Sequence, residues 1–184
     1  FAKIAESQSF METELEVEFF SSDSEDEKLR QARETRELDD KYQMLKADLK
    51  SEINQGLAQI EKVGDQIMIS LSAANSFRSG FAELQPGFLG TLRNVGDSVV
   101  AAGGEVQISG HTDNIPIAFS QRFDSNWDLS AARAASVADF FFTNNNLDSN
   151  SVSVFGYADT KPLADNANAQ GRAANRRIEI LIDG

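Results

Sequence analysis

The sequence predicts an α+β fold (an α/β sandwich), with sheet strands covered by helices on one face and a long helix ahead of them. Strand-like and helix-like patterns alternate from residue 65 onward, which is typical of a sheet packed against helices. An apolar stripe at intervals of three or four runs through residues 29–63, as expected for one face of a long helix. With 184 residues and 41% hydrophobic content, the chain can bury one good core plus an appendage.

The N-terminal 27 residues are strongly acidic, with nine acidic residues against one lysine. Residues 1–12 place apolar side chains near a helical period, whereas residues 14–19 alternate acidic and apolar residues and predict an extended segment. That segment has two interpretations: a mobile tail, or a segment that docks on a partner or a membrane. Residues 21–27 are polar throughout and predict a linker. Within it, Ser24 and Glu27 have the spacing of a capping box that would start the next helix.

A long charged helix is predicted over residues 28–64. It contains no proline, and its first glycine is Gly56. Its apolar stripe must pack either on the chain's own globular part or, in a coiled coil, on a second copy. Successive spacings of four depart from the heptad pattern and weaken the coiled-coil alternative. The stripe consists of Leu38, Tyr42, Leu45, Leu49, Ile53, Leu57 and Ile60.

From residue 65 the pattern becomes that of a compact unit of strands and helices. Strands are predicted at residues 66–71, 105–109, 151–156 and 177–182. A first helix begins after Pro86 and ends at Gly103-Gly104, since proline suits the start of a helix and glycine its end. A second helix is predicted over residues 125–144. The alternation of these elements indicates strands with helices on one face of the sheet.

Composition excludes several classes of function. The formal net charge is −12 and no segment forms a basic patch, so nucleic acid is not an expected partner. The absence of cysteine excludes disulfides, thiolate metal sites and cysteine nucleophiles. No run approaches the roughly 20 apolar residues of a membrane-spanning helix. Because the chain begins with Phe1, we expect a fragment or a processed form whose anchoring segment lies upstream.

Catalytic or metal chemistry would have to centre on His111, the single histidine. Ser109 and Asp113 lie two residues to either side of it, and residues two apart on a strand do not place a base against a nucleophile in the required order. One histidine without cysteine is too few for a zinc site. The glycines match no phosphate or dinucleotide fingerprint. We therefore expect no enzyme activity, metal or cofactor, and assign His111 a hydrogen-bonding role at a strand end.

One carboxylate and one guanidinium are candidates for a binding site. Asp113 follows a predicted strand, and Arg133 lies on the next predicted helix. Such a pair could serve an enzyme or a module that binds a small zwitterion, or it could be a salt bridge between the two residues. A surface salt bridge contributes only about 0–1 kcal/mol, so the fold gains little from that last arrangement.

Three ordered blocks give the chain a resemblance to a known family. They are Gly110-His111-Thr112-Asp113-Asn114, Asn126-Trp127-Asp128-Leu129-Ser130-Ala131-Ala132-Arg133-Ala134 and Gly171-Arg172-Ala173-Ala174-Asn175-Arg176-Arg177-Ile178-Glu179-Ile180. Over roughly residues 65–183 the chain resembles the OmpA-like peptidoglycan-binding domain. Its subtype resembles the flagellar motor stator B subunits of the MotB and PomB group, on the basis of Pro116 and Asn126-Trp127. The resemblance implies a βαβαββ unit with a mixed sheet.

The resemblance also implies a ligand, the diaminopimelate residue of the peptidoglycan peptide, which carries an ammonium and a carboxylate on one carbon. Asp113 would bind the ammonium and Arg133 the carboxylate, since an arginine fork holds a carboxylate bidentately. Thr112 and Asn126 would add hydrogen bonds, although Asn126 is equally well placed to cap the second helix. Arg177, in the last block, would lie near the site.

In the last block, Asn175 and Arg176 would instead tie the final helical turn to the sheet. The resemblance further implies a plug-like amphipathic segment at residues 1–20, a linker and long charged helix at 21–64, and the OmpA-like domain at 65–184.

The implied function is a non-enzymatic cell-wall anchor in the periplasm. An upstream transmembrane helix would sit in the inner membrane beside a channel-forming A subunit of the MotA or PomA type, and the chain would form a homodimer. Alternatives are an OmpA-like envelope tether, a stator-like subunit of a non-flagellar motor and, from another class, a cell-wall hydrolase.

Overall fold

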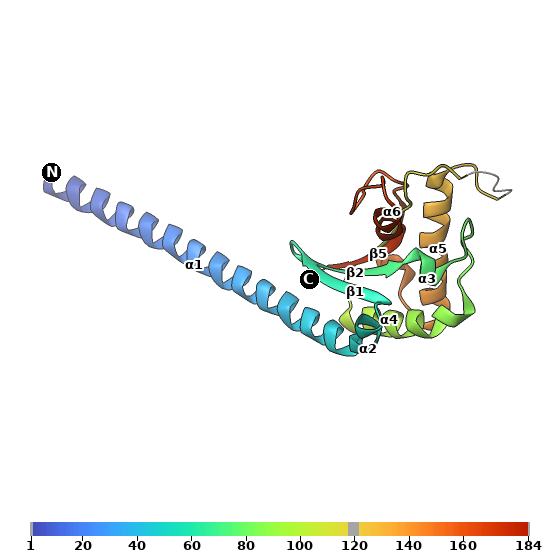
Figure 1. Cartoon of the computed structure of the whole chain (residues 1–184). Coiled ribbons are helices and arrows are strands. Elements are labelled where there is room, and N and C mark those ends of the chain that lie inside the picture. The colour runs from blue at the N-terminus through green and yellow to red at the C-terminus, as the bar shows by residue number, and fades with distance from the viewer. Residues whose placement is uncertain (1, 118–121, 184) are drawn as a thin grey trace.

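A five-stranded mixed sheet forms the centre of the molecule, with helices packed on one face (Figure 1). The computed structural model describes residues 2–117 and 122–183, and the side chains from residue 25 onward. The strands are β1 (Ala58–Val63), β2 (Gln66–Ser72), β3 (Val106–Gly110), β4 (Val152–Gly156) and β5 (Arg177–Asp183), in the order β1-β2-β5-β3-β4. Of the described strand pairs, β3 with β4 is the only parallel one, and the other neighbours are antiparallel. The predicted α+β class and mixed sheet are confirmed.

The helices are α1 (Ala2–Asp48), α2 (Lys50–Asn54), α3 (Ala73–Ser76), α4 (Leu89–Ala102), α5 (Asn126–Asn144) and α6 (Ala169–Asn175), with short 3₁₀ turns η1 (Pro86–Phe88) and η2 (Ser149–Ser151). The core forms where one face of the central strands meets α4 and α5. Ile69, Ile108 and Ile180 from the sheet pack with Val95 and Phe141 from the helices, and all five are fully buried. Among the described residues, no helix combines the length and apolar character needed to cross a membrane.

The C-terminal part of α1 belongs to the same core. Leu45 and Leu49 are fully buried and Leu38 nearly so, whereas every side chain from Glu25 to Glu37 is exposed. Figure 1 shows the helix leaving the body of the domain beyond this point. The apolar stripe of α1 therefore packs on the chain's own globular part, which is the first of the two predicted alternatives.

The predicted helix over residues 28–64 is wrong at its C-terminal end. Gly56 has a φ of +67°, which breaks the helical path, and β1 begins at Ala58. A tight turn at Gly64, with a φ of +65°, then pairs Val63 with Gln66 and joins β1 to β2. The sheet thus has one more strand than predicted. The helix was predicted too long because apolar residues continue at intervals of three or four into the segment that forms β1.

The N-terminal predictions of an extended segment at residues 14–19 and a linker at 21–27 are also wrong, because α1 runs without interruption through both. The capping box at Ser24 and Glu27 consequently starts no helix. An alternating pattern stabilises a strand only where a sheet neighbour is present, and residues 14–19 belong to none of the five strands of the described sheet. Glutamate and leucine are good helix formers, and no glycine or proline interrupts the segment.

Helix α5 lies so close to β3 and β4 that two glycines are required beneath it. A Cβ at Gly110 would lie 2.0 Å from the carbonyl oxygen of Ser130, and one at Gly156 would lie 2.6 Å from the amide nitrogen of Ala131. These glycines place the N-terminal half of α5 directly over the carboxyl ends of the parallel strands. The functional site described below depends on that approach.

We expect Gly110→Ala to destabilise the domain by about 3 kcal/mol, the upper range for overpacking, because α5 would have to move off the sheet. Urea unfolding monitored by circular dichroism measures this. Gly90→Ala is the control, since a Cβ there meets nothing within 4 Å and alanine favours the helix. Equal stability of the two variants would contradict the close approach of α5.

Candidate ligand-binding site

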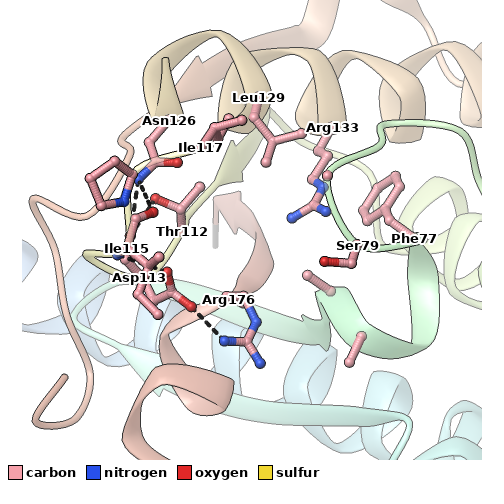
Figure 2. A pocket seen from close by; sticks show the side chains of 14 residues that line it. Phe77, Ser79, Thr112, Asp113, Ile115, Ile117, Asn126, Leu129, Arg133 and Arg176 are labelled. Atoms are coloured by element: carbon pink, nitrogen blue, oxygen red, sulfur yellow. Dashed lines mark hydrogen bonds and ion pairs between the residues drawn. The ribbon is translucent and has the colours of Figure 1, made fainter. Parts of the chain in front are cut away.

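A cavity of about 620 Å³ opens at the carboxyl end of β3, between the start of α5 and the loop that follows α3 (Figure 2). Its walls combine apolar side chains, such as Phe77 and Leu129, with a small number of polar ones. The polar lining consists of Ser79, Thr112, Asp113, Asn126, Arg133 and Arg176. Four of the five residues predicted for the site, all except Arg177, are therefore brought together.

Among the described residues, Asp113 is the only carboxylate that lines the cavity, and it is 7% exposed. One carboxylate oxygen accepts a hydrogen bond from the backbone N–H of Ile115 at 3.0 Å, and the other pairs with Arg176 Nη1 at 2.5 Å. Thr112 Oγ1 donates to the carbonyl of Asp113 at 2.9 Å. These bonds fix the carboxylate at the wall of the cavity.

Asn126 shapes the loop after β3 instead of capping α5. The N-cap is Ser125, whose Oγ accepts a hydrogen bond from the amide of Asp128 at 3.2 Å. The Nδ2 of Asn126 donates to the carbonyls of Asp113 and Ile115, at 3.2 and 3.0 Å. Its amide oxygen is on the cavity side (Figure 2). Of the two predicted alternatives for Asn126, capping is wrong, and a contact with a ligand remains a prediction.

Arg133 enters the cavity from α5 and is 4% exposed. Its Nε donates to the carbonyl of Phe81 at 2.8 Å and its Nη2 to that of Arg78 at 3.3 Å, while the guanidinium lies 5.1 Å from the ring centre of Phe77. Burial, and next the positive charge of Arg176, lower the pKa of Arg133 to about 10, against a smaller opposing effect of Asp113. The group is thus charged at neutral pH but short of negative partners, a setting that favours an anionic ligand.

The salt bridge considered for Asp113 and Arg133 does not form, because Arg176 takes that place. Arg176 lines the cavity, and Figure 2 shows its guanidinium and that of Arg133 extending into the space from opposite sides. The sequence interpretation of Arg176 as a tie between helix and sheet missed this position.

Arg177 lies outside the cavity lining and is buried behind it. Its Nε donates to Glu179 Oε1 at 2.7 Å, and its terminal nitrogens donate to the carbonyls of Asn175 and Lys161 at 3.0 and 3.1 Å. Arg177 is therefore close to the site, as predicted, but it is not among the residues that line the cavity. Successive residues of an extended chain point in opposite directions, so only one of Arg176 and Arg177 could reach the cavity. The alternation of side chains along the strand does not by itself show which of the two arginines faces the cavity.

Glu179 connects Arg177 to the histidine. His111 Nε2 lies 3.1 Å from Glu179 Oε2, and the His111 ring stacks on that of Tyr157 at 5.4 Å between centres. Burial alone would raise the pKa of Glu179, but the hydrogen bond with His111 and the charge of Arg177 outweigh it and lower that pKa to about 2. His111 is 1% exposed and directly follows β3, so its predicted place at a strand end is confirmed. Its ring nitrogens have no well-directed hydrogen bond among the described residues, and its polar contact is the approach to Glu179.

The cavity is suited to binding, since it presents two guanidinium groups and one carboxylate to a ligand. Such a set can hold a carboxylate between the arginines and an ammonium at Asp113, with charge-assisted hydrogen bonds at both ends. The part of the cavity lining that the structure describes includes no histidine, cysteine or lysine. Within the described part of the chain, no cluster of three or more histidine, cysteine or acidic side chains could hold a metal ion.

The chain is similar in sequence and fold to known proteins. The chain is similar to Motility protein B of Bacillus subtilis, with 34% identity over 125 residues, covering 67% of this chain and 48% of the relative. It is 31% identical over 159 residues to Motility protein B of Escherichia coli K12, covering 84% and 51%. The chain thus spans about half the length of these relatives.

Among solved structures, the cell wall anchor of the T6SS from Pseudomonas aeruginosa superimposes with a TM-score of 0.72 and 35% identity, covering 76% of this chain and 96% of that one. Residues 76–176 match the OmpA family. That match covers more than half of the chain, including every described cavity residue except Ala73 and Ala74 and all three sequence blocks up to Arg176. The chain belongs to the OmpA family.

Proposed function

We propose that this chain is the periplasmic part of a flagellar motor stator subunit and anchors the stator by binding peptidoglycan non-covalently. The observation that carries the proposal is the cavity at the end of β3, where Arg133 and Arg176 flank an open space beside Asp113. The similarity to Motility protein B from two bacteria supports the assignment to a motor.

The ligand group is the diaminopimelate residue of the cell-wall peptide. Its carboxylate lies between the two guanidinium groups and supplies the negative charge that Arg133 lacks. Its ammonium binds Asp113, which exchanges part of its contact with Arg176 for the ligand. Thr112 and Asn126 hold the loop that carries Asp113 and offer further hydrogen bonds to the peptide. The reaction is binding alone, with no bond made or broken.

The remaining features of the proposal concern the parts of the protein around this domain. A transmembrane helix in the inner membrane would join a channel-forming A subunit of the MotA or PomA type, and two copies of the chain would form a homodimer. The acidic N-terminal segment, residues 1–20, would act as a plug before the stator engages, and residues 21–64 would connect it to the domain at 65–184.

A second candidate is an envelope tether outside the flagellar motor. The observation that favours it is the 35% identity to the T6SS cell wall anchor, of which the chain covers 96%. Both candidate functions use the same ligand, and they differ in the complex that is anchored to the cell wall. Deletion of the gene decides between them: loss of motility supports the stator, and full motility with an altered envelope or secretion phenotype supports the tether.

The purified chain should sediment with sacculi that contain diaminopimelate and bind lysine-containing sacculi more weakly. Lysine carries the same ammonium without the adjacent carboxylate, so Arg133 and Arg176 would have no anion to hold. Free diaminopimelate should compete for the site. Equal binding to both types of sacculi would contradict the assigned ligand group, and absence of binding to either would contradict the anchor. Released muropeptides would indicate a hydrolase instead.

A further inference from the structure

We propose that three buried ionisable side chains beneath the cavity set the spacing of the cavity's own charged groups. They are His111, Arg177 and Glu179, called the ionic trio below. The groups that they position are Asp113 and Arg176. This inference rests on the proposed function, because a change in spacing is expressed as a change in affinity for the cell-wall ligand.

The ionic trio joins the two chain segments that supply the opposed charges of the cavity. The carboxylate of Glu179 contacts His111 with one oxygen, at 3.1 Å, and Arg177 with the other, at 2.7 Å. His111 stands two residues before Asp113, and Arg177 directly follows Arg176. The backbone N–H of His111 also donates to the carbonyl of Arg177 at 2.9 Å. A displacement within the trio therefore moves both halves of the charged pair in the cavity.

Arg177 also forms hydrogen bonds with the end of α6 and with the loop after β4. Its guanidinium donates to the carbonyl of Asn175, at the end of α6, and to that of Lys161, in the loop after β4. The ring of His111 stacks on Tyr157 from the same loop. Three segments that are distant in sequence thus meet at one buried group of polar side chains, outside the lining of the cavity.

Fold stability alone gives little reason for this arrangement. The three side chains are 1%, 4% and 9% exposed, in the order His111, Arg177, Glu179, and buried ion pairs are often no more stabilising than apolar side chains of similar volume. None of the three lines the cavity, so direct contact with a ligand does not explain them either. The directed hydrogen bonds of Arg177 and the 3.1 Å contact between His111 and Glu179 do explain them, because apolar side chains cannot hold neighbouring segments at a defined distance.

The test replaces the ionic trio with apolar side chains of similar size, His111→Phe, Arg177→Met and Glu179→Leu together. We expect this triple variant to keep its melting temperature within a few degrees but to bind diaminopimelate-containing sacculi about tenfold more weakly, the lower range for loss of groups that orient a metal ligand. Val99→Ala is the control for stability, since it truncates a fully buried side chain of α4 that neither belongs to the trio nor lines the cavity. It should lower the melting temperature and leave the affinity unchanged.

A second readout requires no ligand. The backbone N–H of Ile115 donates to Asp113 Oδ1 at 3.0 Å, so its hydrogen-exchange rate reports how well the carboxylate is held. We expect faster exchange in the triple variant and an unchanged rate in Val99→Ala, measured well below both melting temperatures. Failure of the unsubstituted chain to bind sacculi would overturn the proposed function, whereas the exchange rate still decides whether the trio positions Asp113.

Wild-type affinity and wild-type exchange at Ile115 in the triple variant would overturn the inference. If the triple variant does not fold, Glu179→Gln takes its place, because glutamine keeps the size of the side chain and removes the charge. A lower affinity of the folded protein then supports positioning. An affinity equal to that of the wild type, with only a lower melting temperature, contradicts it.

Discussion

Replacement of Arg133 with alanine should abolish binding to peptidoglycan while the domain remains folded. The guanidinium is buried in the cavity wall and has two protein carbonyls as hydrogen-bond partners, which leaves most of its five N–H donors for a ligand. Loss of one member of a buried, hydrogen-bonded charge pair costs about 2–5 kcal/mol of binding free energy. Because about 1.4 kcal/mol is a factor of ten in affinity, sedimentation with sacculi should fall to background.

Two further variants sharpen this experiment. Arg133→Lys keeps the charge, yet one ammonium cannot reach Phe81, Arg78 and the ligand carboxylate together, so it should bind little better than alanine. Arg93→Gln is the matched control, since Arg93 is an exposed arginine on α4 whose side chain bonds only to Asn144 among the described residues. Binding by Arg133→Ala at the level of the control would remove the basis of the proposed site.

The ligand-binding end of the sheet could be predicted from sequence because its signals are local. A strand followed closely by a carboxylate, and then a helix with an arginine about two turns beyond its start, set Asp113 and Arg133 on the same side of the fold. Those two elements are adjacent in the structure because Gly110 lets α5 approach β3. Thr112 and Asn126, next to them in sequence, consequently reach the same cavity.

The parts that could not be predicted depend on contacts between distant segments. The choice between Arg176 and Arg177 is made by Glu179 and His111, which draw Arg177 into the interior and leave Arg176 for Asp113. Likewise, the wall formed by residues 77–80 carries no motif of its own and enters the site only because the chain folds back there. Strand β1 was not predicted because its apolar residues continue the helical spacing of the preceding segment. Its conformation is set instead by hydrogen bonding to β2, which the sequence pattern does not reveal.

A second large effect is expected when Glu179 is replaced with alanine. The change leaves the guanidinium of Arg177 buried, at 4% exposed, without its carboxylate partner. Breaking a buried pair in this way costs about 3–5 kcal/mol of stability, against a total of about 5–15 kcal/mol for a typical domain. Urea unfolding at neutral pH should show a marginally stable or unfolded protein. The triple apolar variant should be more stable than this single variant, because it buries no charge at the trio.

The Glu179 carboxylate also makes the stability of the domain depend on pH in the acid range. The pKa of Glu179 is about 2 in the folded chain, compared with 4.5 for an unperturbed glutamate. Because the folded-state value is the lower one, the stabilisation is complete above about pH 4.5 and is lost as the pH falls towards 2. This difference between the two pKa values corresponds to about 3 kcal/mol of unfolding free energy at most. Urea unfolding at several pH values through this window should therefore show a steeper loss of stability for the wild type than for Glu179→Gln. Identical slopes would mean that the contacts with His111 and Arg177 do not favour the ionised carboxylate.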